Sequence, residues 1–143
     1  AARDLAAAVN LGERYAELLH QESFAWSGAD RPGPFLNQTS GDWHTFTENP
    51  VDHNGRAHRD QDAAFGSILR RQRFCVHYWL EPFTGMYRQL MSGRVRVIWP
   101  RTALDPRGLV EVCPEAQADA FEIDVRRWFS ITMPLALRSN QVQ

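Results

Sequence analysis

The chain has 143 residues, 43% of them hydrophobic and 23% charged, and its formal net charge is −1. These ordinary globular values exclude a disordered chain and give no overall charge that would attract nucleic acid. No apolar run reaches the roughly 18 residues of a transmembrane helix, and the N-terminus lacks a signal-peptide pattern. The sequence therefore predicts one soluble domain over residues 1–143, with neither a membrane nor a nucleic-acid partner.

The basic residues are unusual in kind and in distribution. The sequence is lysine-free, so that all 16 Lys and Arg positions hold arginine, and amine-nucleophile chemistry is excluded. Residues 1–55 hold three Arg and eight acidic residues, whereas residues 56–96 hold eight Arg and three acidic residues. This asymmetry has two interpretations: the two segments dock on each other, or the middle of the chain presents a patch to an anion.

The first predicted element is a helix near residues 3–21. Apolar side chains recur there at helical spacing on a face made of Leu5, Val9, Gly12, Ala16 and Leu19. Residues 22–58 contain three prolines and several glycines, which predicts a long irregular segment that could contain short strands. Its aromatic residues are expected to attach it to the core, and these are Phe24, Trp26, Phe35, Trp43 and Phe46.

Two elements are predicted in the middle of the chain. A second helix begins at Asp60 or Asp62, either of which can cap its N-terminus, and ends near Arg71. Residues 73–80 are rich in aromatic and β-branched side chains, which is typical of a strand buried on both faces, and Glu81-Pro82 is expected to end it.

Shorter elements follow. Residues 84–92 fit either a short helix or a strand that joins the next one through a turn at Ser92-Gly93. Residues 94–99 alternate as a strand, with Val and Trp on one side and Arg on the other. Residues 109–113 predict another strand, and residues 114–120 a short helical turn that opens on a proline.

The clearest pattern covers residues 121–137. Odd positions are apolar and even positions polar throughout, which indicates a strand with one face on the core. A strand of this length exceeds the usual range of about 3–10 residues, so we expect a bend or a bulge in it. Pro134 indicates that its end lies at the edge of a sheet.

This order of elements predicts an α+β fold, with N-terminal helices packed on a curved, mostly antiparallel sheet. A cone-shaped sheet of the NTF2-like kind has the same order, and this is an analogy of architecture alone. In such a cone the inner face of the last strand lines a pocket.

Arg127 interrupts the apolar face of the last predicted strand. A buried guanidinium is costly unless it is paired. Two alternatives follow: a bulge turns Arg127 out to solvent, or a pocket holds it inside, where it binds a carboxylate or phosphate of a substrate.

A second candidate site lies in the predicted loop and the helix start after it. Three of the five histidines and several carboxylates fall within residues 44–62, and Asp52, His53 and His58 are the candidates for moving protons. The spacing matches no metal motif, so we expect no metal there. The alternative is a polar loop followed by an ordinary helix cap.

His77 shares one face of its predicted strand with Cys75 and Trp79. It is either a satisfied core histidine or a substrate-binding residue. Cys75 and Cys113 are the only cysteines, and both lie in strand-like segments. Two buried free thiols are favoured over a disulfide.

Two functions are compatible with these patterns. The first is a small-molecule pocket protein, a cofactor-free lyase, isomerase or hydrolase, in which Arg127 and His77 bind an anionic substrate. No glycine-rich nucleotide loop is present in the sequence, so no cofactor is expected. The alternative is a non-enzymatic assembly subunit, such as a virion, phage or secretion-machine component, that self-associates as a homo-oligomer.

Overall fold

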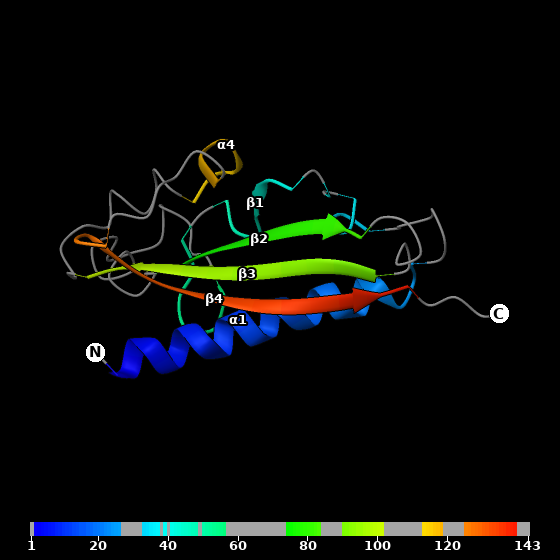
Figure 1. The fold of residues 1–143 in the computed structure, drawn as a ribbon. Coiled ribbons are helices and arrows are strands. Elements are labelled where there is room, and N and C mark those ends of the chain that lie inside the picture. The colour runs from blue at the N-terminus through cyan, green and yellow to red at the C-terminus, as the bar shows by residue number, and fades with distance from the viewer. Residues whose placement is uncertain are drawn as a thin grey trace.

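The computed structural model describes residues 2–26, 33–37, 39, 41–48, 50–56, 74–83, 90–101, 113–118 and 125–139. Within these ranges a long N-terminal helix packs on a four-stranded antiparallel sheet (Figure 1), which confirms the predicted α+β class. The elements are α1 (Ala2–Ser23), β1 (Trp43–Thr45), β2 (Cys75–Pro82), β3 (Leu90–Pro100), α4 (Glu115–Ala118) and β4 (Trp128–Arg138). The predicted second helix at 60–71 and most of the predicted strand at 109–113 lie outside the described residues.

The sheet is a simple antiparallel meander in the order β1-β2-β3-β4. Its register aligns residues across all four strands, because each strand pairs with the next in sequence. One such row on the face opposite α1 consists of Trp43, Trp79, Arg94 and Pro134, and the next consists of Thr45, His77, Arg96 and Thr132.

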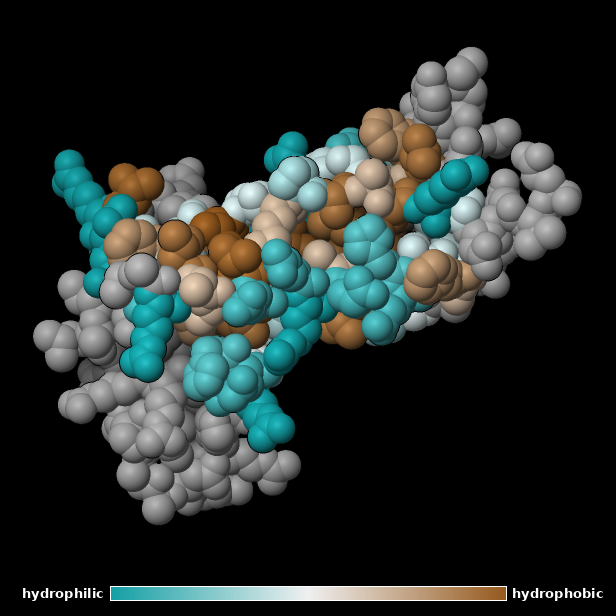
Figure 2. All heavy atoms as spheres, turned by 90° about the horizontal axis from the view of Figure 1, so that it is seen from below, coloured by the Kyte–Doolittle hydropathy of each residue, from teal (hydrophilic) through white to brown (hydrophobic). Residues whose placement is uncertain are grey.

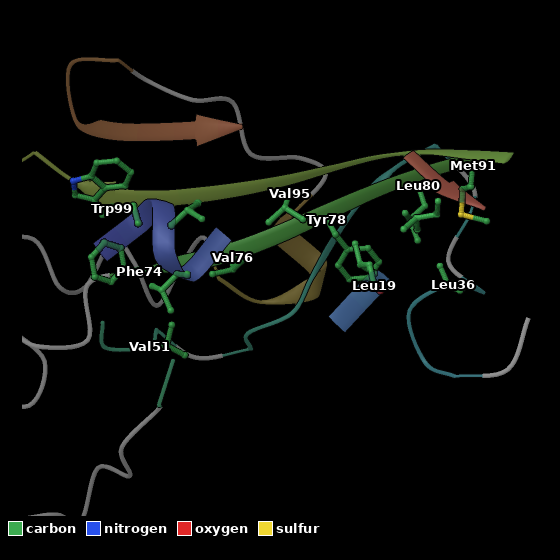
Figure 3. Packing of buried hydrophobic residues seen from close by; sticks show 14 of the residues in the cluster. Leu19, Leu36, Val51, Phe74, Val76, Tyr78, Leu80, Met91, Val95 and Trp99 are labelled. Atoms are coloured by element: carbon green, nitrogen blue, oxygen red, sulfur yellow. The ribbon is translucent and has the colours of Figure 1, made fainter. Parts of the chain in front are cut away.

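The helix α1 packs against β3 and β4 through Gly12, Ala16 and Leu19 of its predicted stripe, whereas Leu5 in the same stripe is 47% exposed. A Cβ added at Gly12 would lie 2.8 Å from Met133 Sδ and 3.5 Å from Val97 Cγ2, so glycine permits the close approach of helix and sheet. The other buried partners on this side include Leu19, Val76, Tyr78, Val95 and Trp99 (Figure 3). The core thus lies between α1 and one face of the sheet.

The strands differ from the predicted ones at their ends. Ser92 and Gly93 lie inside β3, so the predicted turn at this pair is wrong. Gly93 lies between Leu80 and Leu135, which an added Cβ would approach to 3.1 Å, and this packing explains a glycine in a strand. The strand β4 begins at Trp128, and residues 125–127 form a turn. From Phe129 to Leu137 the predicted alternation of inner and outer side chains holds.

The loop after α1 is attached to the body through its backbone and two side chains. The carboxylate of Glu22 accepts hydrogen bonds from the amides of Phe35 (3.2 Å) and Leu36 (3.0 Å). Trp26 and Leu36 are fully buried, as expected for residues that anchor a loop. Phe24 is instead 69% exposed, so its predicted anchoring role is wrong.

The hydrogen bonds between β1 and β2 show which backbone groups face outward at the two sheet edges. Val76 and Leu80 direct their carbonyls to β1, where they accept from the amides of Phe46 (2.9 Å) and Gly41 (3.3 Å). The side on which a residue's backbone donor and acceptor point alternates along a strand. The register therefore directs the backbone N–H and C=O groups of the even-numbered residues of β4 away from β3. Pro134 is one of these, so the described outer edge of β4 lacks one donor near its middle. Among the described strands β4 is at one edge of the sheet, which agrees with the predicted position of this proline.

Candidate functional site

The predicted catalytic pair Asp52 and His53 lies in a tight turn. The Oδ1 atom of Asp52 accepts hydrogen bonds from the amides of Asn54 (2.9 Å) and Arg56 (3.0 Å), and Gly55 completes the turn at φ 80°. The carboxylate therefore organises its own loop, which matches the alternative of a polar loop. His53 is exposed, and His58 lies outside the described residues.

Arg127 lies in the turn before β4 and its side chain is exposed. Its guanidinium carbon lies 5.5 Å from the centroid of the Trp128 ring, and its carbonyl accepts a hydrogen bond from the Arg101 amide at 2.9 Å. The alternation of inner and outer side chains holds only from Phe129 onward, so it does not extend back to Arg127. The inward orientation is therefore wrong, and the outward alternative matches the structure.

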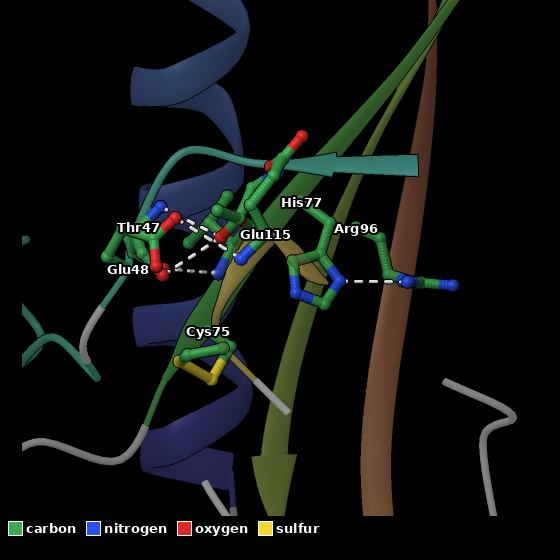
Figure 4. Close-up of a disulfide and its surroundings, with 9 residues drawn as sticks. Thr47, Glu48, Cys75, His77, Arg96 and Glu115 are labelled. Atoms are coloured by element: carbon green, nitrogen blue, oxygen red, sulfur yellow. Dashed lines mark hydrogen bonds between the residues drawn. A yellow bond between two sulfur atoms is a disulfide. The ribbon is translucent and has the colours of Figure 1, made fainter. Parts of the chain in front are cut away.

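A buried polar pair lies on the sheet face opposite α1 (Figure 4). Arg96 NH2 donates to His77 Nδ1 at 2.8 Å and to the carbonyl of Ala118 at 3.0 Å. Arginine has only donors, so Nδ1 must accept, and the imidazole is neutral with its proton on Nε2. His77 is completely buried and Arg96 is 5% exposed. The predicted core histidine thus has a specific partner, which the sequence did not identify.

Two arginines on this face stack on tryptophans. Arg96 lies 3.9 Å from the ring centroid of Trp43, and Arg94 lies 4.8 Å from that of Trp79. Both distances are within the range of a cation–π contact. The indole nitrogen of Trp79 also donates to the Gly41 carbonyl, which fixes the ring on which Arg94 rests.

The short helix α4 covers the outer edge of β1. Glu115 uses one carboxylate oxygen for His44 Nδ1, at 2.5 Å, and the other for the amide of Thr45, at 2.6 Å. That amide points away from β2, so the carboxylate occupies a position at which another strand could pair. The Glu115 amide in turn donates to Glu48 at 3.2 Å.

Cys75 and Cys113 form a disulfide, with their Cα atoms 5.3 Å apart, so the expectation of two free thiols is wrong. The bond lies in a small buried cluster with Ile98 and Trp128, on the same face as His77. It ties the segment that leads into α4 to the start of β2. The sequence signal was weak, because 38 positions separate the two cysteines and only the fold brings them together.

Two tyrosines on the core side have raised pKa values. Burial raises the pKa of Tyr78 well above its ordinary value, and the negative charges of Glu115 and Glu22 raise it further. Burial also raises the pKa of Tyr15, although the charge of Arg14 partly opposes this. Both tyrosines contact Phe46, with ring centroids 4.8 Å (Tyr15) and 4.5 Å (Tyr78) away, and are protonated core side chains at neutral pH.

Among the described residues no group of His, Cys, Asp or Glu side chains has the geometry of a metal site. No helix in the described part of the chain is long and apolar enough to cross a membrane. Comparison with known proteins gave no match, whether to a family model, to a curated protein or to a solved structure. The chemistry of this chain must therefore be argued from its own residues.

Proposed function

We propose that this chain is a non-enzymatic structural subunit of a larger assembly. The observation that carries the proposal is the exposure of large hydrophobic side chains. Four of them are between 46% and 69% exposed, namely Leu5, Phe24, Phe83 and Val125. Removing exposed apolar side chains from water is favourable, which supports their being covered by other chains in the assembly.

These side chains gather at the two ends of the molecule. Leu5 lies in the first turns of α1 and Val125 just before β4, and both elements begin at the same end in Figure 1. Phe24 and Phe83 follow the other ends of α1 and β2. In the view from below, hydrophobic residues are visible along the length of the described surface, interspersed with hydrophilic residues (Figure 2).

The candidate site residues that the structure describes support the same proposal. Asp52, a candidate catalytic residue, holds a turn, and His77, a candidate substrate-binding residue, is fixed by Arg96 in a buried contact. A pocket protein acting as a cofactor-free lyase, isomerase or hydrolase on an anionic substrate remains the alternative prediction. It would require Arg127 to bind substrate from its exposed turn.

The disulfide supports an assembly that works in an oxidising compartment, because structural disulfides are rare in the reducing cytosol. We therefore place the proposed function outside the cytosol.

The proposal is tested by the mass of the oxidised protein in solution, measured by light scattering over a wide range of concentrations. We expect species larger than the monomer, and we expect Phe24→Ser combined with Phe83→Ser to reduce their amount. Phe46→Ser is not a suitable control because Phe46 packs on the core, so Thr132→Ser on the exposed face of β4 serves instead. A monomeric wild-type protein at every concentration would refute the proposal.

A further inference from the structure

The outer surface of α1 carries two carboxylates that pair with no cation among the described residues. Glu13 and Glu17 are exposed and lie four residues apart, so they are neighbours on one side of the helix. Like charges at this spacing destabilise a helix slightly. Neither forms a salt bridge with another described residue, and Arg14 between them donates to the Asn54 carbonyl. We call Glu13 and Glu17 the acidic stripe.

The opposite side of the molecule carries exposed arginines. Arg94 on β3 and Arg138 on β4 both point to the sheet face away from α1, which also carries the exposed Glu81 of β2, and neither arginine forms a salt bridge with a described residue. The neighbouring exposed side chains on β4 are small, namely Thr132, Pro134 and Ala136. We call Arg94 and Arg138 the basic sheet surface.

Arg94 is prepared for recognition of a carboxylate. Its guanidinium stacks on Trp79, whose ring is itself held by a hydrogen bond to Gly41. A guanidinium that is already oriented loses less side-chain freedom when it binds, and its planar N–H groups match the two oxygens of a carboxylate.

Strand addition, the other common route to self-association, is hindered at both sheet edges that the structure describes. Glu115 takes the outward amide of Thr45 on β1, and Pro134 removes one outward donor from β4. The faces of the molecule are therefore better suited to contact another copy than the edges are.

We propose that the acidic stripe of one copy binds the basic sheet surface of a second copy. This inference rests on the proposed function and names the partner in the assembly. The two surfaces lie on opposite sides of the fold, so the contact is heterologous and each added copy presents both surfaces again. Such a contact produces an open stack of molecules, with α1 of each copy lying across the sheet of the next.

Charge reversal provides the test. One variant carries Arg94→Glu and Arg138→Glu, so that both of its surfaces are acidic. A second variant carries Glu13→Arg and Glu17→Arg, so that both of its surfaces are basic. Arg56→Glu reverses an exposed arginine that belongs to neither surface and is the control. All proteins are compared oxidised, at low ionic strength, by sedimentation velocity across a concentration series.

We expect each double variant alone to need at least about tenfold more protein to associate than the wild type, because like charges then meet in the contact. An equimolar mixture of the two is expected to associate as the wild type does, since acidic and basic surfaces then alternate. The control is expected to behave as the wild type.

The remaining outcomes separate this contact from the proposed function. If the wild type associates but the two variants associate equally well alone, or their mixture fails to recover, the contact is wrong and the assembly role stands. If the wild type stays monomeric throughout, both are wrong. Unchanged urea unfolding midpoints of the variants would show that the differences do not come from unfolding.

Discussion

Arg94 and Arg96 lie two positions apart on β3, point to the same face and both stack on a tryptophan, yet their environments differ. Arg94 is exposed, whereas Arg96 is 5% exposed and donates to His77 and to the Ala118 carbonyl. The difference comes from α4, whose last residue supplies that carbonyl. Sequence alternation assigns both residues to one face correctly, but it cannot say which half of the face another segment covers.

Arg96→Ala is expected to lower the free energy of unfolding by about 3 kcal/mol. The substitution leaves His77 Nδ1 and the Ala118 carbonyl without this donor, at about 1–3 kcal/mol each, and removes the stacking on Trp43. Arg96→Lys retains the charge but cannot serve both acceptors from one planar group, so its effect should be intermediate. Urea unfolding of the dilute protein measures this, with Arg94→Ala as the exposed control at roughly 0.5 kcal/mol or less. Equal losses at the two positions would contradict the structural role of Arg96.

Stability is expected to fall as pH rises above about 10, the ordinary tyrosine pKa. The pKa of Tyr78 and of Tyr15 is raised in the folded state, mainly by burial. Above pH 10 the unfolded chain loses these protons while the folded chain keeps them, so the unfolded state binds fewer protons and stability declines with pH. The sequence has no lysine and both cysteines are bonded, so few other side chains titrate in this range.

Urea unfolding from pH 8 to 11.5 should show this decline, and Tyr78→Phe should make it shallower. If the phenylalanine variant has the same slope as the wild type, Tyr78 is not responsible for the loss. The comparison needs no correction for the size of the side chain, because a difference in slope is independent of a constant difference in stability.

Among the elements, α4 is held in place from three directions. The disulfide fixes the residue two positions before it, Glu115 binds β1, and Ala118 accepts from Arg96. A helix of four residues has almost no stability of its own. Its position therefore depends on these tertiary contacts.

Removing the disulfide with Cys75→Ala and Cys113→Ala together is expected to lower the free energy of unfolding by about 4 kcal/mol, from the entropy of closing a loop of 38 residues. Hydrogen exchange should show the loss locally as well. The amide of Thr45, which Glu115 covers, should lose protection, while the amide of Phe46, which bonds to Val76, should lose less. Equal loss at the two amides would mean that α4 does not depend on the disulfide.

Pro134→Thr is expected to increase aggregation without lowering the stability of the monomer. The substitution restores an outward N–H on the edge of β4 and adds a residue that favours strands. Ala136→Thr adds the same side chain on the same edge but no new donor, and so is the matched control. Light scattering after prolonged incubation measures the effect, and equal aggregation of the two variants would exclude the missing donor as its cause.

The sequence predicts those elements whose periodicity comes from contact with the core. Apart from the exposed Leu5, the stripe of α1 and the alternation from Phe129 to Leu137 follow from the sequence, because burial on one side imposes a regular pattern. The sequence does not predict the start of β4, the position of Ser92 and Gly93 inside β3, or the disulfide, because each depends on residues distant in the chain. The buried pair of His77 and Arg96 was missed for the same reason: their alignment follows from the register of β2 and β3.

At the scale of the whole molecule, the formal net charge of −1 conceals an uneven surface. The acidic stripe lies on α1, and the basic sheet surface on the other side of the sheet. Long-range attraction between copies can therefore operate even though the overall charge is nearly zero.

Association is accordingly expected to weaken with salt. Raising the ionic strength from about 0.1 M to about 1 M shortens the screening length from about 10 Å to about 3 Å, which weakens contacts between exposed charges. An assembly held only by the exposed apolar side chains would respond oppositely to sodium sulfate, which strengthens apolar burial. Sedimentation velocity at increasing concentrations of sodium sulfate therefore distinguishes the two cases, because the charged contact weakens and a purely hydrophobic contact strengthens.

The bond between Cys75 and Cys113 has a consequence for how the chain matures. A chain with only two cysteines has a single intramolecular pairing, so oxidation within one molecule cannot yield a mispaired isomer that must be reshuffled. The one possible error is a bridge between two molecules. Correct oxidation then requires only that newly made copies be kept apart, and an oxidase alone, without an isomerase, would suffice to form the bond.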